Sequence, residues 1–122
     1  MPQIFIMSRK GEIIEKIAEL NAGNSNELIR LAEEVWPMAK DDITLTAVRT
    51  SLSVNEADLQ VEVRYTTDWD YGNGEGRFDP DAKDREALAD AIGKKLKGLF
   101  PFLEDISVWV MPYRDTTFKI FR

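Results

Sequence analysis

Residues 28–37, LIRLAEEVWP, set a pattern that residues 92–101, IGKKLKGLFP, repeat 64 positions later. In each segment, apolar residues at helical spacing run into an aromatic residue followed by proline. Proline ends a helix because it lacks the backbone N–H and clashes with the preceding turn. The matched residues are Leu28, Ala32, Val35, Trp36 and Pro37 against Ile92, Leu96, Leu99, Phe100 and Pro101. The sequence therefore predicts two copies of one helical unit.

The repeat continues beyond the prolines. After a gap of one residue, 40–45 (KDDITL) aligns with 103–108 (LEDISV). Both stretches have two acidic residues at their second and third positions and then pass into residues that favour a strand. Each copy therefore consists of a helix, an aromatic-proline stop, an acidic turn and a strand.

The remaining pattern supplies the other elements. Short apolar or alternating runs predict strands, and apolar residues at three- and four-residue steps predict helices. The expected strands are 3–8, 43–54, 59–66, 106–111 and a short 116–121, and the expected helices are 12–20, 24–35 and 85–99. Strands 43–54 and 59–66 are expected to be adjacent, because only residues 55–58 join them.

These elements predict an α+β fold in a single domain, 1–122. Two right-handed β-α-β units, about 1–54 and 59–122, would form one four-stranded mixed sheet with its helices on one face. The opposite face is apolar for a surface in water, and a symmetric homo-oligomer is its simplest cover. The residues that make this face are Thr44, Thr46, Val48, Ser107, Trp109 and Met111.

Composition excludes several function classes. The 122 residues carry a net charge of −6 and a pI near 4.7, which disfavours nucleic acid and anionic membranes as partners. There is no cysteine and no histidine, so disulfides, the usual zinc ligands, thiol nucleophiles and imidazole bases are excluded. Residues 1–10 have neither a signal-peptide pattern nor a membrane-spanning length, so a cytoplasmic protein is expected.

The chain begins Met1-Pro2, and the proline opens a strand. Together with the β-α-β repeat, the length and the lack of cofactor motifs, this resembles the tautomerase superfamily. The resemblance is to its longer form with two fused halves, as in macrophage migration inhibitory factor and 5-carboxymethyl-2-hydroxymuconate isomerase. It implies a homotrimer without a cofactor, in which the initiator methionine is removed and Pro2 moves a proton in a small keto-enol carboxylate.

The resemblance also suggests residues that hold the substrate carboxylate. Arg49 falls on the second strand, where one branch of the family has an arginine, and Lys40 falls where another has a lysine. Arg9 follows the first strand and Arg64 lies on the third, so each could reach the same end of the sheet. Trp109 falls where one branch has a tyrosine. As alternatives, the arginines are solvated surface groups and Trp109 packs in a subunit interface.

Residues 68–81 are rich in glycine and aspartate. Gly72–Gly76 lacks the strand-glycine-helix context of a phosphate loop. The acidic residues could be calcium ligands, but Gly72 occupies a ligand position and the closing Glu of a calcium loop is missing. We expect a loop between strand and helix, and no metal site.

Two functions therefore remain open. The first is a tautomerase or isomerase that uses Pro2. The second is a non-catalytic binding or assembly module on the same scaffold.

Overall fold

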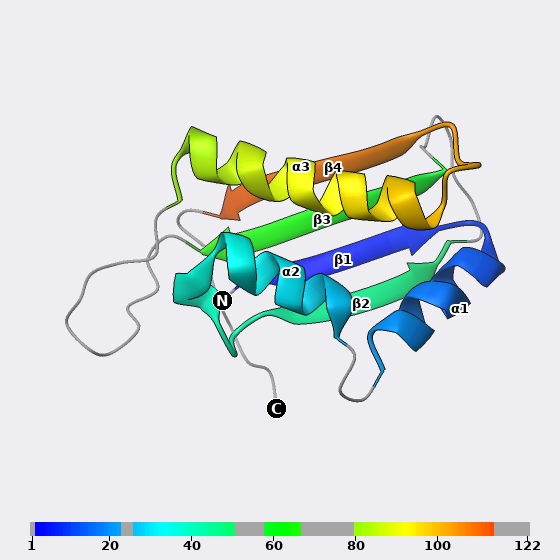
Figure 1. Cartoon of the computed structure of the whole chain (residues 1–122), viewed down its shortest axis with the longest axis horizontal. Coiled ribbons are helices and arrows are strands. Elements are labelled where there is room, and N and C mark those ends of the chain that lie inside the picture. The colour runs from blue at the N-terminus through cyan, green and yellow to red at the C-terminus, as the bar shows by residue number, and fades with distance from the viewer. Residues whose placement is uncertain (1, 23–25, 51–57, 67–79, 114–122) are drawn as a thin grey trace, which may run out of the picture.

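The computed structural model describes residues 2–22, 26–50, 58–66 and 80–113 (Figure 1). Within these residues the chain forms a mixed sheet and a set of helices. The elements in chain order are β1 (Gln3–Ser8), α1 (Gly11–Leu20), α2 (Glu27–Val35), the 3-10 helix η1 (Pro37–Ala39), β2 (Thr44–Arg49), β3 (Leu59–Thr66), α3 (Ala82–Leu99) and β4 (Ile106–Tyr113).

The sheet has the order β2-β1-β3-β4. β1 pairs in parallel with β2, and β3 pairs in parallel with β4, so each pair is one β-α-β unit. The central pair, β1 and β3, is antiparallel and joins the two units. The expectation that β2 and β3 are adjacent is wrong, because β1 lies between them. β1 is buried on its inner face and forms hydrogen bonds along both edges, so it occupies a central position in the sheet. The short connection between the strands 43–54 and 59–66 gave no information about this position of β1.

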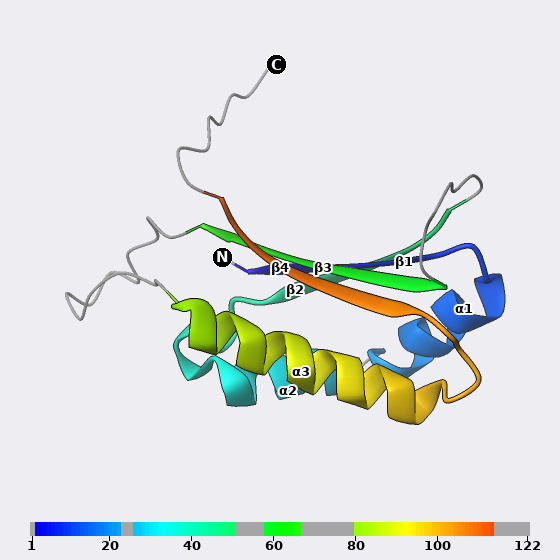
Figure 2. The ribbon, with the colours of Figure 1, turned by 90° about the horizontal axis from the view of Figure 1, so that it is seen from above.

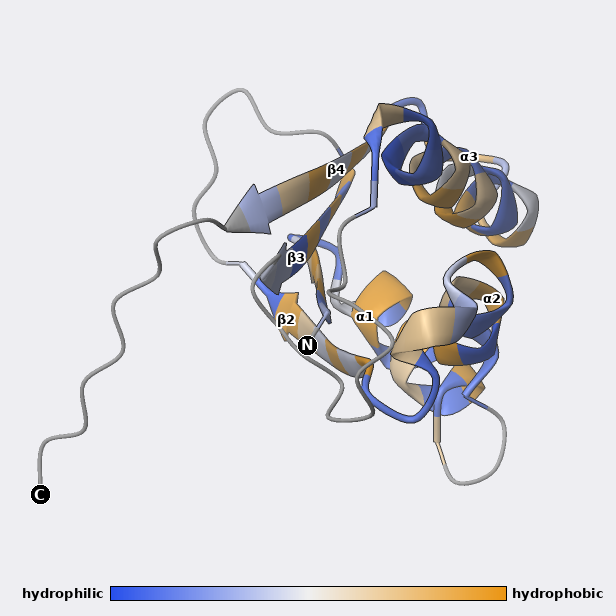
Figure 3. Ribbon diagram, turned by 90° about the vertical axis from the view of Figure 1, so that its left-hand side faces the viewer, coloured by the Kyte–Doolittle hydropathy of each residue, from blue (hydrophilic) through white to orange (hydrophobic). Residues whose placement is uncertain are grey.

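All three α-helices cover one face of the sheet (Figure 2). Alternate residues of β1 and β3 are buried against the helices. These residues are Ile4, Ile6, Leu59, Val61, Val63 and Tyr65. Figure 3 shows hydrophobic and hydrophilic residues in alternation along β3. The predicted α+β class, with a four-stranded mixed sheet and helices on one face, is confirmed. None of the helices in the described residues is long and apolar enough to cross a membrane.

The sequence repeat is also a repeat of structure. Trp36 and Phe100 both end a helix with φ and ψ outside the helical region, at −121° and 75° and at −128° and 64°. Both backbone N–H groups donate to the carbonyl four residues earlier, at 2.8 Å in each case. A residue before proline is pushed out of the helical region, so the following prolines explain both stops. Both rings are buried in the core.

Some boundaries differ from the prediction. α3 begins at Ala82 rather than at residue 85, because Asp81 and Asp84 form a capping box in which each side chain accepts a hydrogen bond from the other's backbone N–H. β2 ends at Arg49 rather than at residue 54. Residues 51–54, the predicted strand 116–121 and most of the acidic loop lie outside the described residues.

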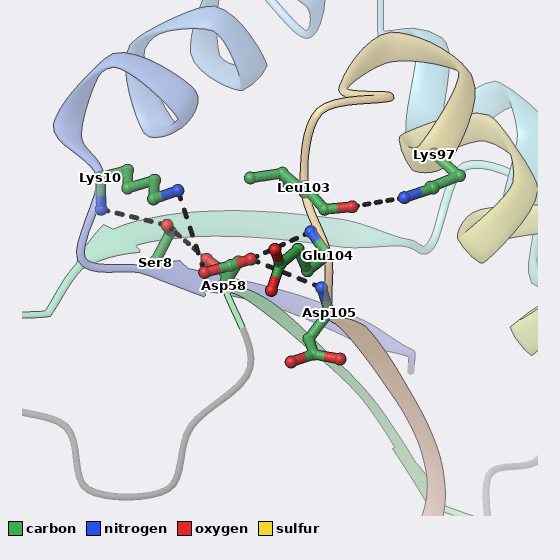
Figure 4. A network of polar contacts seen from close by, with 7 residues as sticks. All are labelled: Ser8, Lys10, Asp58, Lys97, Leu103, Glu104 and Asp105. Atoms are coloured by element: carbon green, nitrogen blue, oxygen red, sulfur yellow. Dashed lines mark hydrogen bonds and ion pairs between the residues drawn. The ribbon is translucent and has the colours of Figure 1, made fainter.

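Asp58 ties three segments together at one end of the sheet (Figure 4). Its backbone carbonyl accepts a hydrogen bond from the Ser8 hydroxyl at 2.7 Å, at the end of β1. One carboxylate oxygen accepts from the backbone N–H groups of Glu104 at 3.1 Å and Asp105 at 3.4 Å, before β4. The other oxygen lies 3.8 Å from Nζ of Lys10. The start of β3 is thereby fixed to both of its neighbours.

These contacts perturb the acidity of Asp58. Hydrogen bonds from the backbone of Asp105 and then Glu104 hold the pKa of Asp58 below its ordinary value, and the charges of Lys10 and Arg9 act in the same direction. A depressed carboxyl pKa means that the ionised form is favoured by folding.

Asp58→Asn is expected to lower the free energy of unfolding near neutral pH and to change it little in acid. Because the folded pKa is depressed, the contribution of Asp58 is complete above the pKa of an unfolded aspartate, about 3.9, and is lost as the pH falls through the folded pKa. Urea unfolding near neutrality and near pH 2 to 3 measures this difference. Asp105→Asn, which changes an exposed carboxylate in the same turn, is the control. An equal loss near neutrality in both variants would contradict the assignment.

Candidate active site

Pro2 lies immediately before β1 and is buried. Its carbonyl oxygen accepts a hydrogen bond from the backbone N–H of Thr44 at 3.2 Å, at the start of β2. On the other edge of β1, Gln3 lies opposite Arg64, near the end of β3. Pro2 therefore has a fixed place at one end of the two central strands.

Two of the predicted site residues share this end of the sheet. Lys40 is exposed and follows η1, four residues before β2 begins. Arg64 lies on the face opposite the helices. Its guanidinium donates to the Glu62 carboxylate, with 2.5 Å between Nη2 and Oε2, and lies 4.7 Å from the centre of the Phe5 ring. The charge of Arg64 is thus directed toward the middle of the open face and is partly balanced by Glu62.

Trp109 lies on the same open face, opposite Glu62 in the β3–β4 register. Its side chain is 56% exposed, although it stands in the middle of a strand. The six residues predicted to form this face do lie away from the helices, as the register and burial show. Val48, on β2, is also 45% exposed.

Arg9 and Arg49 lie at the other end of the sheet. Arg9 follows the last residue of β1, and Ser8 lies opposite Arg49 at the end of β2. The six residues of β1 separate them from Pro2 by roughly 20 Å at about 3.3 Å per residue. The expectation that Arg9 and Arg64 reach the same end is wrong within one chain, because β3 runs antiparallel to β1. The structure places Arg9 and Arg49 at one end of the sheet, far from Pro2 of the same chain.

Arg49 points toward the beginning of α1. A Cβ added to Gly11 would meet its Nη1 at 3.2 Å, which is closer than ordinary van der Waals contact. Glycine at this position lets the guanidinium pass close to the backbone.

A buried aromatic pair lies on the helix side of the Pro2 end. Continued by one residue, the β1–β3 register brings Pro2 opposite Tyr65. The Tyr65 ring meets Trp36 edge to face at 5.1 Å, and Nε1 of Trp36 donates to the backbone carbonyl of Asp84 at 3.1 Å. This pair gives the start of β1 a rigid apolar support.

Asp42 was not identified as a site residue from the sequence. It precedes the buried Ile43 at the entrance to β2, and its Oδ2 atom is buried with no hydrogen-bond partner in the described residues. In the sequence, Asp42 is one of two neighbouring acidic residues in a predicted turn. Nothing in this pattern indicates that one of its carboxylate oxygens is enclosed.

Other potential sites lie elsewhere or outside the described residues. A shallow groove between α3 and β4 is lined in part by Gly93, Lys94, Lys97, Ile106 and Val108, in the half of β4 far from Pro2. No group of three or more acidic side chains in the described ranges is placed to hold a metal ion. The acidic residues of the glycine-rich loop, from Asp68 to Asp79, are outside those ranges.

Comparison with known proteins identifies the fold. No family model and no curated protein sequence matches the chain. A protein of unknown function from Vibrio cholerae matches with a TM-score of 0.64 and 14% identity, over 98% of this chain and 83% of that one. A domain of unknown function (DUF1904) from Sebaldella termitidis matches with a TM-score of 0.55 and 19% identity, over 93% and 89% of the two chains.

A 5-carboxymethyl-2-hydroxymuconate delta-isomerase matches more weakly, with a TM-score of 0.44 and 11% identity over 100% of this chain and 86% of that one. At these identities the likeness concerns the fold alone. The two parallel strand pairs and the single layer of helices agree with the expectation drawn from the repeat, whereas the order of the strands differs from it. The chain shares its fold with the Vibrio cholerae and Sebaldella termitidis proteins of unknown function.

Proposed function

We propose that this chain is a tautomerase or isomerase that moves a proton in a small keto-enol carboxylate, with Pro2 as general base or acid. The observation that carries the proposal is the place of Pro2. It is buried at the start of a central strand and held by the Thr44 hydrogen bond. A nitrogen positioned in this way has the fixed geometry that proton transfer to or from carbon requires.

The chemistry requires that Met1 be removed. Pro2 then carries a free secondary amine, and an α-amino group has a pKa of about 7.7–8.0, close to working pH. The neutral amine takes a proton from the carbon beside the carbonyl, and the electron pair of the broken C–H bond forms the enolate. The ammonium returns the proton to oxygen or to the other carbon. The chain has no histidine that could take this role.

A carboxylate substrate and its enolate need positive charge nearby. Lys40 and Arg64 lie at the Pro2 end of the same chain. Arg9 and Arg49 lie at the opposite end, so they reach Pro2 only if it belongs to a second copy. We propose a site between copies of a homo-oligomer, a trimer in the sequence-based expectation, in which Pro2 of one copy meets Arg49 and Arg9 of another.

The exposed face of the sheet supports a second candidate, a non-catalytic binding or assembly module. Trp109 and Val48 both lie on this face and are largely exposed. Such a module needs neither a free amine at Pro2 nor removal of Met1. The two candidates are separated by tests on Pro2 itself.

Pro2→Ala is expected to lower the rate of phenylpyruvate or hydroxymuconate tautomerisation by about 100-fold or more, since general acid-base groups contribute about 10²–10⁴-fold. Intact mass of wild type purified from its native host shows whether Met1 is absent. Pro112→Ala, which changes an exposed proline at the same end of the sheet, is the control and should retain activity. If the wild-type protein keeps Met1 and has no tautomerase activity, the non-catalytic binding module is the better account.

Mixed oligomers test whether the site spans two copies. Pro2→Ala and Arg49→Ala are each expected to be inactive alone, and co-expression of the two should restore part of the activity. Recovery follows because some sites in the mixture combine an intact Pro2 with an intact Arg49. Co-expression of Pro2→Ala with Arg64→Ala gives no recovery if Arg64 serves the Pro2 of its own chain. Full activity of Arg49→Ala alone would remove Arg49 from the site.

A further inference from the structure

Asp42 carries a polar atom that the described structure does not satisfy. Its Oδ2 atom is buried and accepts no hydrogen bond from the described residues, while its backbone N–H donates to the carbonyl of Ala39 at 3.0 Å. A buried oxygen of a carboxylate without a donor costs free energy, and such atoms are uncommon in folded proteins. The turn before β2 therefore carries an enclosed acceptor that lacks a donor among the described residues.

The strand register places the turn that carries this acceptor next to Pro2. Gln3 lies opposite Thr44 in the parallel β1–β2 pair, and the Thr44 N–H donates to the Pro2 carbonyl. Continued by one residue, the same register pairs Pro2 with Ile43. Asp42 is the next residue of the turn, on the side toward which the backbone nitrogen of Pro2 lies. Removal of Met1 leaves a secondary ammonium there with two N–H donors.

The other charged groups around the start of β1 fit this role less well. Lys40 and Asp41, on the same turn, are exposed. Arg64, on β3, is bound to Glu62. The residues at the end of β4, Met111 and Pro112, carry no charge. Among the described acidic residues at the Pro2 end of the sheet, Asp42 has both an enclosed oxygen and a position next to Pro2 in the β1–β2 register.

We propose that Asp42 is the positioning residue for Pro2: with Met1 removed, its carboxylate accepts a hydrogen bond from the Pro2 amine and fixes the direction of the nitrogen lone pair. This inference rests on the proposed function of Pro2. An opposite charge at hydrogen-bond distance favours the protonated amine. The carboxylate therefore raises the pKa of the amine above that of an isolated α-amino group. This makes the neutral amine a stronger but less populated base, and it extends the pH range in which the ammonium donates its proton.

The test is a titration of the Pro2 nitrogen by ¹⁵N NMR, in protein labelled with ¹⁵N-proline and shown by intact mass to lack Met1. The chain has five prolines, and only Pro2 then carries an amine rather than an amide nitrogen. Asp42→Asn keeps the shape of the side chain and removes its charge. Asp42→Ser is a second variant, and Asp41→Asn is the matched control on the adjacent exposed residue.

The titration midpoint is expected to fall by about one pH unit or more in Asp42→Asn and Asp42→Ser, and to stay unchanged in Asp41→Asn. Midpoints equal to wild type in both Asp42 variants, with folded spectra, would overturn the inference. Because no substrate is present, the result is independent of turnover. A shifted midpoint in a protein without tautomerase activity supports the ion pair and rejects the proposed function. Activity that depends on Pro2, together with an unshifted midpoint, supports the proposed function and rejects the ion pair with Asp42.

Discussion

The antiparallel pairing of β1 with β3 is the contact on which the rest of the structure depends. It is the only strand pairing in the described sheet that joins the two β-α-β units. Ile4 and Ile6 of one unit lie opposite Val63 and Val61 of the other, and all four are at most 1% exposed. Full burial of each such side chain contributes about 1.5–3 kcal/mol, so separating the units would expose a large part of the core.

The same pairing determines what lies at each end of the sheet. Because β3 runs against β1, the start of β1 meets the end of β3, and the end of β1 meets the start of β3. Pro2 therefore shares an end with Arg64, and Arg9 shares an end with Asp58. The Asp58 network reinforces this arrangement, since it ties the start of β3 to Ser8 on one side and to the turn before β4 on the other.

The sequence predicts local structure well where the signal is local. Residues 3–8 and 59–66 have the same bounds as β1 and β3, because alternating burial and flanking breakers mark both strands. The aromatic-proline stops were also predicted, since proline acts on the residue immediately before it. The order of the strands was not predicted. A short connection favours neighbouring strands, whereas the position of β1 between β2 and β3 results from packing between residues far apart in the chain.

The candidate site shows the same limit. Residue types alone indicate Pro2 as a possible base and the arginines as possible anion contacts, but they do not give the direction of each strand. Arg9 and Arg64 were expected together because each is near a strand end, and only the register shows that the ends differ. Asp42 has no sequence signal of its own, because an enclosed oxygen depends on how Ala39 and Ile43 fold the turn into the core.

The distribution of charge explains why a site between copies suits an anionic substrate better than a site within one chain. With a net charge of −6, the protein repels carboxylates unless cations are concentrated locally. At the Pro2 end, Nη2 of Arg64 lies 2.5 Å from Oε2 of Glu62. A carboxylate substrate bound there would have to displace the Glu62 carboxylate or share Arg64 with it. At the other end, Arg9 follows the last residue of β1 and Arg49 is the last residue of the neighbouring β2. A second copy that presents this end to Pro2 would add two positive charges to Lys40 and Arg64, whose charges are offset by Asp41, Asp42 and Glu62 at the same end of the chain.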